Sequence, residues 1–192
     1  GVANLQEQKR ERVIVDEINK WSKTKVLLGI EADIISEDGT LDIDNETLQQ
    51  YKRMMSIHYP SHTWLSLSDK EFLKKLGAYR TDKREKTEGL PIAGLLMFGK
   101  SDSIKDEYCC PNYFPDYREY FSNDPHARWT NRVYPDGTWE ANLFQFYMRV
   151  YNKLAAALPK PFALKNGQRI DESSAHVALR EAFINALVHC DY

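Results

Sequence analysis

The stretch "WEANLFQFYMRVYNKLAAAL", residues 139–158, has the clearest helical pattern in the chain and decides the fold of its second half. Apolar side chains recur along it every three or four residues: Leu143, Tyr147, Val150, Leu154 and Leu158. This spacing places them on one side of an α-helix, the side that packs on a core. Pro159 and Pro161 end the helix, because proline cannot continue its hydrogen bonding. We predict a long amphipathic helix whose apolar stripe is core rather than a cofactor pocket.

The segment before this helix, residues 109–137, contains many aromatic residues, prolines and turn-forming residues, and we expect it to be ordered but irregular. A short strand around Arg132 should end at the Asp136-Gly137 turn. The segment also interleaves arginine and aromatic side chains: Arg128, Trp129, Arg132 and Tyr134. Such a pattern can contact nucleic acid through charge and stacking, or form cation–π pairs inside the protein. We favour the internal pairs.

Further upstream, residues 90–99 read "LPIAGLLMFG", a continuous apolar run bounded by Pro91 and Gly99. A run of this length suits a β-strand that is buried on both faces. We therefore expect residues 90–98 to belong to a small mixed sheet that the 139–158 helix covers.

The N-terminal half is predicted to be mainly helical, with one β-hairpin. Residues 4–22 place apolar side chains at roughly helical spacing, and Asp38-Gly39 between two apolar runs is typical of a hairpin turn. Asp44 is positioned to cap a following helix. That helix should end just before Pro60, because the residue before a proline is disfavoured in the α-conformation.

A second helix in this half has stronger end signals. Ser68 and Glu71 have the spacing of a capping box, and Gly77 is placed for a left-handed C-cap. Residues 79–89 then mix charges of both signs, which indicates a solvated connector.

Together these elements predict an α+β fold: a helical N-terminal half with one β-hairpin, then a small mixed sheet packed against a long amphipathic helix. The predicted divisions are a helical subdomain over 1–78, a charged connector over 79–89, an α+β subdomain over 90–170, and a last helix within 171–192.

The composition limits the classes of partner. With 26 Lys+Arg against 28 Asp+Glu, the chain has no overall field that would attract nucleic acid or an anionic membrane. It contains no apolar run of the roughly 18 residues that a membrane span needs, and its N-terminus lacks a signal-peptide pattern. We expect free thiols at Cys109, Cys110 and Cys190, and a cytoplasmic location.

The last stretch, "ALREAFINALVHCDY" (178–192), places Glu181, Asn185 and His189 on one stripe of a helix. The rest of the circumference is mostly apolar, so we expect the helix to be buried. A buried carboxylate and amide need partners. One interpretation is an internal hydrogen-bond network, and the other is a magnesium–nucleotide site in which the amide binds the cation and the carboxylate activates water.

This stretch resembles the "LREALxNAxxHxDY" signature at the start of the divergent GHKL-type ATPase domain of a family of bacterial and archaeal transcriptional regulators. These proteins are labelled RecG-related and helicase-like, and they typically carry a Schlafen/AlbA-type DNA-binding domain at the N-terminus. The resemblance spans about residues 40–192. It also covers "IAGLLMFGK" (92–100), "YFPDYRE" (113–119) and "RWTNRVYPDGTWEANLFQFYMRVYNKL" (128–154).

By this resemblance, Glu181 takes the place of the general base and Asn185 that of the magnesium ligand, while His189 matches the family's nucleotide-site pattern. ATP and magnesium are then the cofactors expected of the full-length protein. The glycine-rich loops that such a site requires do not occur in this sequence, and nothing before residue 40 resembles the AlbA-type sheet. We therefore expect a middle segment of a larger regulator that binds no cofactor by itself.

Three hypotheses about function follow. The segment is a connector between a DNA-binding domain outside this chain and a nucleotide-responsive part, with little or no catalysis of its own. Alternatively, the full-length protein is an ATPase that uses Glu181 and Asn185, or the chain is a protein-interaction scaffold in which the last helix only packs. We also expect some apolar surface of 177–189 to be unprotected, which would favour a homodimer.

Overall fold

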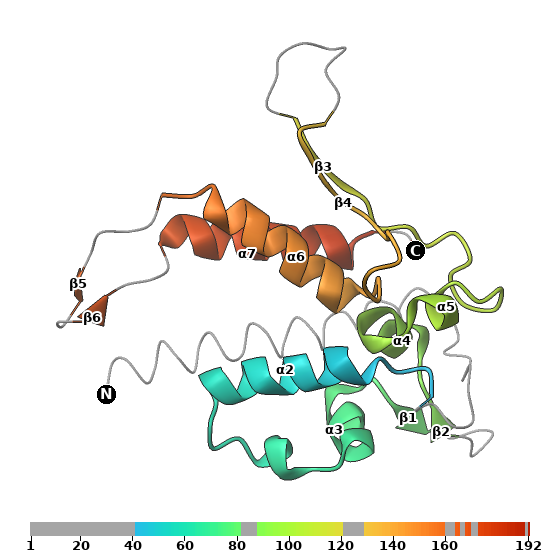
Figure 1. Ribbon diagram of the computed structural model, residues 1–192. Coiled ribbons are helices and arrows are strands. Elements are labelled where there is room, and N and C mark those ends of the chain that lie inside the picture. Colours follow the sequence, from blue (N-terminus) through green and yellow to red (C-terminus); the bar gives the residue numbers. More distant parts are fainter. Residues whose placement is uncertain are drawn as a thin grey trace. The chain divides into compact units, whose positions relative to one another are not determined.

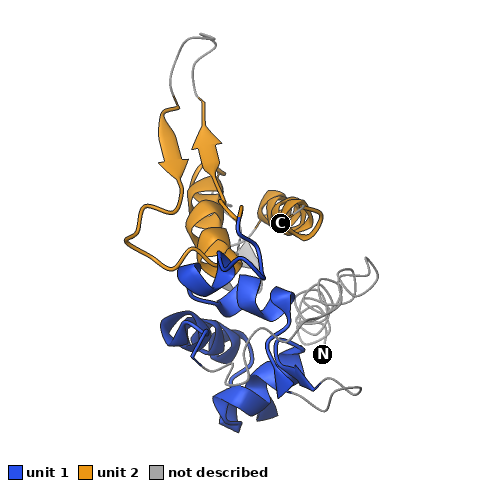
Figure 2. Cartoon of the chain, turned by 90° about the vertical axis from the view of Figure 1, so that its right-hand side faces the viewer, with its two compact units in different colours: residues 1–111 blue, residues 112–192 orange. Residues whose placement is uncertain are grey.

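The structure is a computed structural model, shown as a ribbon in Figure 1. It describes residues 41–81, 88–120, 129–159, 164–165, 168–169, 173–190 and 192. The helix predicted over 4–22 and the hairpin predicted at Asp38-Gly39 lie outside the described residues. The described part has the predicted α+β composition, and the chain divides into two compact units, residues 1–111 and 112–192 (Figure 2).

The first described helix of unit 1 is α2, Asn45–His58, and both of its predicted ends are confirmed. The Asp44 carboxylate accepts a hydrogen bond from the backbone N–H of Thr47 at 3.0 Å, which satisfies one of the unpaired donors of the first turn. The helix ends at His58, and its C-cap residue Tyr59 lies directly before Pro60.

The 3₁₀ helix η1, Thr63–Ser66, and the helix α3, Asp69–Leu76, follow. Ser68 and Glu71 form the predicted capping box at the start of α3. Gly77 ends α3 with φ of 75°, a left-handed conformation that glycine adopts without the penalty of a Cβ atom. Local side-chain chemistry therefore sets both ends of this helix.

A short antiparallel ladder lies within the predicted connector. Strand β1, Arg80–Thr81, pairs with β2, Glu88–Gly89, and residues 82–87 between them are outside the described part. The contacts place 79–89 inside unit 1 and divide the chain after Pro111. The assignment of 1–78, 90–170 and 171–192 as separate functional parts stays a prediction.

The prediction that 90–98 forms a strand is wrong, because Ile92–Phe98 is the helix α4. A second short helix, α5, covers Ser101–Ile104. A short apolar run has no periodicity that separates a buried strand from a buried helix. The predicted burial is correct, since Leu95, Leu96 and Phe98 are at most 1% exposed.

The core of unit 1 forms where α2, α3 and α4 meet. The Tyr51 ring of α2 packs edge-on against Phe72 of α3 and Phe98 of α4, with centroid distances of 6.1 and 5.3 Å. The apolar side chains that are buried to 2% exposure or less in this unit are Leu48, Phe72, Leu73, Leu90, Leu95, Leu96, Phe98 and Ile104. A single antiparallel bridge between Ile43 and Gly99 joins the segment before α2 to the end of α4.

Unit 2 begins with a two-stranded antiparallel ribbon. Strand β3, Tyr117–Glu119, pairs with β4, Asn131–Val133, so that Arg118 lies opposite Arg132. β4 confirms the short strand predicted around Arg132. Gly137 in the predicted turn has φ of 83°. The three described sheets are all antiparallel pairs, so the small mixed sheet expected around 90–98 is also wrong.

Helix α6, Leu143–Ala156, confirms the predicted long helix but begins four residues later than expected. The Asn142 side chain accepts a hydrogen bond from the Gln145 backbone N–H at 3.0 Å and so caps the helix at Leu143. Val150 on the predicted stripe is fully buried.

The chain then forms a short antiparallel pair, β5 (Leu164–Lys165) with β6 (Gln168–Arg169), and ends in helix α7, Ser174–Val188. Residues 166–167, between β5 and β6, lie outside the described residues. In Figure 1, α7 runs beside α6.

Candidate functional site

Helix α7 carries Glu181 and Asn185, with His189 as its C-cap residue, and its start is fixed by a capping box. The Ser173 hydroxyl oxygen accepts from the His176 backbone N–H at 3.4 Å, and the Ser173 backbone N–H donates to His176 Nδ1 at 3.3 Å. His176 is 7% exposed. The sequence pattern did not reveal the role of His176, because a capping box usually has Glu or Gln at that position.

One side of α7 packs on α6 through aromatic and aliphatic side chains. The Phe183 ring is stacked on Tyr147 with a centroid distance of 5.5 Å and an interplanar angle of 13°. Phe183 and Leu187 also pack against the buried cluster that contains Phe146 and Val150.

Among the described residues, no helix combines the length and apolar character needed to cross a membrane.

The predicted site residues lie on the other side of α7. At 100° per residue, Glu181 and Asn185 lie about 120° to 160° around the helix from Phe183 and Leu187. Glu181 and His189 are exposed, and Asn185 is half-buried. His189 is the C-cap residue, and its backbone N–H donates to the Asn185 carbonyl oxygen at 3.1 Å. The helix thus presents the stripe to solvent.

The expectation that α7 is buried nearly all round is therefore wrong. Only His176 is buried in this helix, and the positions flanking Glu181 on its outer side are small: Ala178, Ala182 and Ala186 are all exposed. Alanine has little apolar area to bury and a high helix propensity, so a helix can leave such positions in water at low cost. The apolar surface expected to be unprotected over 177–189 is present, since Val177 is also 37% exposed.

The chemistry available on this stripe is that of hard oxygen donors. Magnesium takes six oxygen ligands and usually keeps several waters, with one or two protein carboxylates or amides and substrate phosphates. Glu181 and Asn185 can supply two such oxygens, which fits a partial site. The described residues contain no group of three or more His, Cys, Asp or Glu side chains able to hold a metal ion.

A second cluster of polar side chains lies on the β3–β4 ribbon; we call it the arginine–aromatic cluster, formed by Asp116, Arg118, Trp129, Arg132 and Tyr134. Asp116 binds both arginines: Arg132 Nε and Nη2 donate to its two carboxylate oxygens at 2.7 and 3.0 Å, and Arg118 Nε donates at 2.8 Å. Hydrogen bonds from Arg132, and then those from Arg118, hold the pKa of the Asp116 carboxyl below its usual value.

The same cluster confirms that the arginines make cation–π contacts within the protein. The Arg132 guanidinium carbon lies 4.2 Å from the Tyr134 centroid and 5.1 Å from that of Trp129, and the Arg118 carbon lies 5.2 Å from Trp129. Arg128 is outside the described residues. The sequence pattern did not reveal the roles of Asp116 and Arg118, although their spacing of two residues, with Tyr117 between them, places both on one face of a strand.

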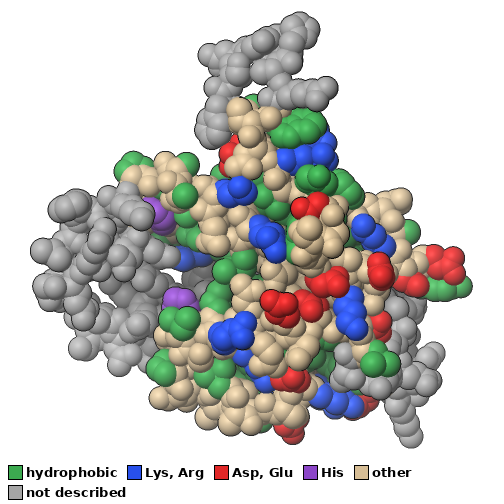
Figure 3. Space-filling view, in the orientation of Figure 1, with side chains coloured by type: hydrophobic (Ala, Val, Ile, Leu, Met, Phe, Trp, Pro, Cys, Tyr) green, Lys and Arg blue, Asp and Glu red, His purple; other side chains and the backbone are tan. Residues whose placement is uncertain are grey.

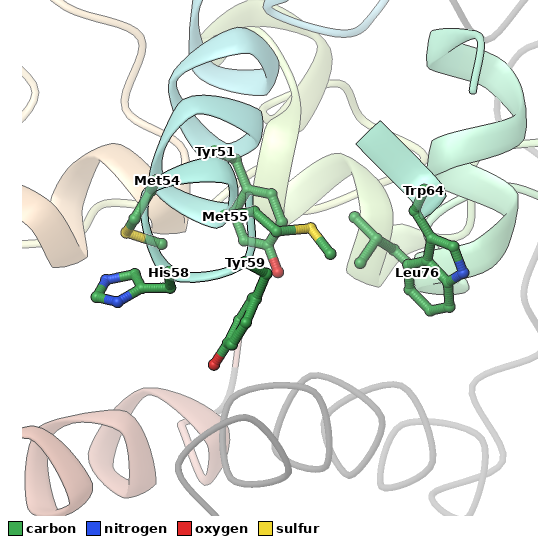
Figure 4. Close-up of a pocket in the computed structure, with 7 residues that line it drawn as sticks. All are labelled: Tyr51, Met54, Met55, His58, Tyr59, Trp64 and Leu76. Atoms are coloured by element: carbon green, nitrogen blue, oxygen red, sulfur yellow. The ribbon is translucent and has the colours of Figure 1, made fainter. Parts of the chain in front are cut away.

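A small pocket in unit 1 is apolar and aromatic. It is lined by Tyr51, Met54, Met55, His58, Tyr59, Trp64 and Leu76, and Figure 4 shows Met54 and His58 to one side of Tyr51 and Trp64 and Leu76 to the other. His62 is not among these residues; its Nδ1 accepts a hydrogen bond from the Trp64 backbone N–H at 3.1 Å and caps η1. The pocket lacks the converging polar groups that a catalytic site requires.

None of the three cysteines forms a disulfide in the described part of the chain: Cys109 is half-buried, Cys110 is buried and Cys190 is exposed. Ordinary packing accounts for Cys110.

Residues 29–116 match the model of a family described as a domain of unknown function, DUF8451. The match includes α2 to α5 of unit 1 and ends before the β3–β4 ribbon and α7. No curated protein and no solved structure matches the chain.

Proposed function

We propose that the chain is a connector in a DNA-binding transcriptional regulator, and that α7 is the first helix of a GHKL-type nucleotide-binding domain of that regulator. The observation that supports this proposal is the division of α7 into two sides. Phe183 and Leu187 attach one side to α6, while Glu181 stays exposed on the other. An exposed carboxylate is open to water, so a water molecule can approach it as the attacking nucleophile would.

The roles proposed for the stripe follow from its donor atoms. The Asn185 amide oxygen is a hard donor that would hold magnesium, and the Glu181 carboxylate would accept a proton from the attacking water. Magnesium, when bound with ATP, supplies charge neutralisation at the phosphates. His189, at the end of the same stripe, would border the nucleotide.

The test is ATP hydrolysis by the full-length protein, compared with Glu181→Ala and with Glu107→Ala, which removes an exposed glutamate from unit 1. Loss of a general base should lower kcat by about 10²- to 10⁴-fold, while Glu107→Ala should leave it unchanged. Equal rates for the parent and Glu181→Ala would show that the base is assigned wrongly.

The connector proposal has its own test on the 192-residue chain. Because two oxygen donors do not complete a nucleotide site, calorimetry with Mg-ATP should show no binding. A micromolar Kd for this chain would overturn the connector proposal and favour a self-sufficient nucleotide site.

A scaffold in which α7 only packs has weaker support. That function would require Glu181 and Asn185 to be buried and satisfied by neighbouring side chains, whereas Glu181 is exposed. Homodimerisation through the exposed alanines and Val177 stays a prediction. It can be checked by light scattering at several protein concentrations, where a constant monomer mass would contradict it.

A further inference from the structure

The β3–β4 ribbon has one face in the core and one face in solvent. Side chains alternate between the two faces of a strand, so Tyr117 and Val133 share one face while Arg118 and Arg132 share the other. Val133 is 7% exposed and belongs to the buried cluster, against which Tyr117 packs. The arginine pair therefore lies on the outer face of the ribbon.

Asp116 holds the two arginines in place without cancelling their charge. Each guanidinium has five N–H donors, of which two from each are directed at Asp116. Two positive charges and one negative charge leave a net positive outer face. Because the side chains are already ordered, an anion that binds them pays little of the usual entropic cost of immobilising arginine.

Large aromatic side chains lie on or beside this face and remain partly in solvent. Tyr120 is 59% exposed, Trp129 39% and Tyr134 37%. The space-filling view shows hydrophobic and basic side chains next to each other at the ribbon, below the grey segment (Figure 3). Exposed aromatic rings beside guanidinium groups are the two components of a surface that binds an unpaired nucleic-acid strand.

We propose that the outer face of the β3–β4 ribbon binds single-stranded nucleic acid. Arg118 and Arg132 contact phosphates, and Trp129 stacks on bases together with Tyr120 or Tyr134. Duplex nucleic acid keeps its base faces stacked on one another, so it would use the arginines but not the rings. A protein partner could occupy the aromatic rings without any phosphate group for the arginines to bind. The site is separate from α7 and does not depend on nucleotide hydrolysis.

The test is fluorescence anisotropy of a labelled oligothymidylate of about 15 nucleotides titrated with the 192-residue chain. Trp129→Ala should weaken binding by about 5- to 150-fold, the equivalent of losing one stacked base, and Trp129→Phe should restore most of it. Arg118→Gln should weaken binding and reduce the slope of log K against log salt by about 0.7, as expected for one lost phosphate contact.

The matched control is Arg149→Gln. Arg149 is exposed and lies over a tryptophan, Trp139, at 4.7 Å, but it is on α6 rather than on the ribbon. The Arg149→Gln variant should bind the oligonucleotide as the parent does. Circular dichroism should confirm that all variants are folded. The proposal is overturned if the parent does not bind at low salt, if Trp129→Ala binds like Arg149→Gln, or if a duplex of equal length binds as tightly.

Discussion

Replacing Gly94 by alanine tests the packing of α4 in unit 1. In an ordinary helix this change stabilises, because glycine is about 1 kcal/mol less favourable than alanine in a helix interior. Here a Cβ atom on Gly94 would lie 2.2 Å from the carbonyl oxygen of Ala78, 2.9 Å from its carbonyl carbon and 3.0 Å from its Cα. All three are backbone atoms, so no change of rotamer can relieve the overlap.

The expected magnitude follows from this distance. A carbon and an oxygen in contact lie about 3.3 to 3.6 Å apart, so the two backbones would have to separate by about 1 Å. Leu95 and Leu96, which are fully buried next to Gly94, would be displaced with α4. Overpacking costs about 1 to 3 kcal/mol, and we take the upper end because backbone must move. After the propensity gain of about 1 kcal/mol, the net loss of stability should be about 2 kcal/mol.

Thermal unfolding followed by far-ultraviolet circular dichroism measures this loss. For a chain of this size, about 2 kcal/mol corresponds to a fall in Tm of about 4 to 8 °C. Ala93→Gly is the control, because it removes a Cβ from the same helix and should cost only about 1 kcal/mol. An unchanged or higher Tm for Gly94→Ala would refute the close approach of α4 to Ala78.

Three further predictions concern charge, capping and the two sides of α7. Glu88 forms ion pairs with Lys74 at 2.8 Å and with Lys70 at 2.9 Å. Hydrogen bonds from Lys74, and then from Lys70, lower the pKa of Glu88 from 4.5 to about 2, so the stabilisation from these ion pairs is present above about pH 4.5 and is lost as the pH falls towards 2. Glu88→Gln should remove this part of the pH dependence of the urea midpoint, and an unchanged profile would argue against the ion pairs. Ser173→Ala should cost about 1 kcal/mol in urea unfolding, whereas Ser174→Ala, at an exposed neighbouring position, should cost nothing measurable. Phe183→Ala should cost about 2 kcal/mol, since the half-buried ring packs on α6, while Glu181→Ala should stay within about 0.5 kcal/mol; similar losses would contradict the two-sided description of α7.

Much of the local structure could be predicted because its causes are short-range. Asp44, the Ser68–Glu71 pair and Gly77 each act within one helical turn, and all three predictions are confirmed. The start of α6 was predicted four residues early, because the apolar character of Trp139 suits either a helix or the loop that packs beside it. Asn142 decides the start.

Longer-range features could not be predicted in the same way. Residues 92–98 are apolar at nearly every position, so their sequence predicts burial but does not distinguish a strand from a helix. The salt bridges of Asp116 depend on the register of β3 against β4, which brings Arg132 beside a residue 16 positions away. Sequence spacing carries no information about that pairing.

For the candidate site, the sequence by itself determined that Glu181, Asn185 and His189 share one stripe, because helical periodicity alone places them there. The same sequence predicted that this stripe would be buried, and it is not. Burial depends on how many neighbours a helix has, and the described contacts of α7 come mainly from α6 on the opposite side. Only tertiary packing could decide that the carboxylate of Glu181 faces water.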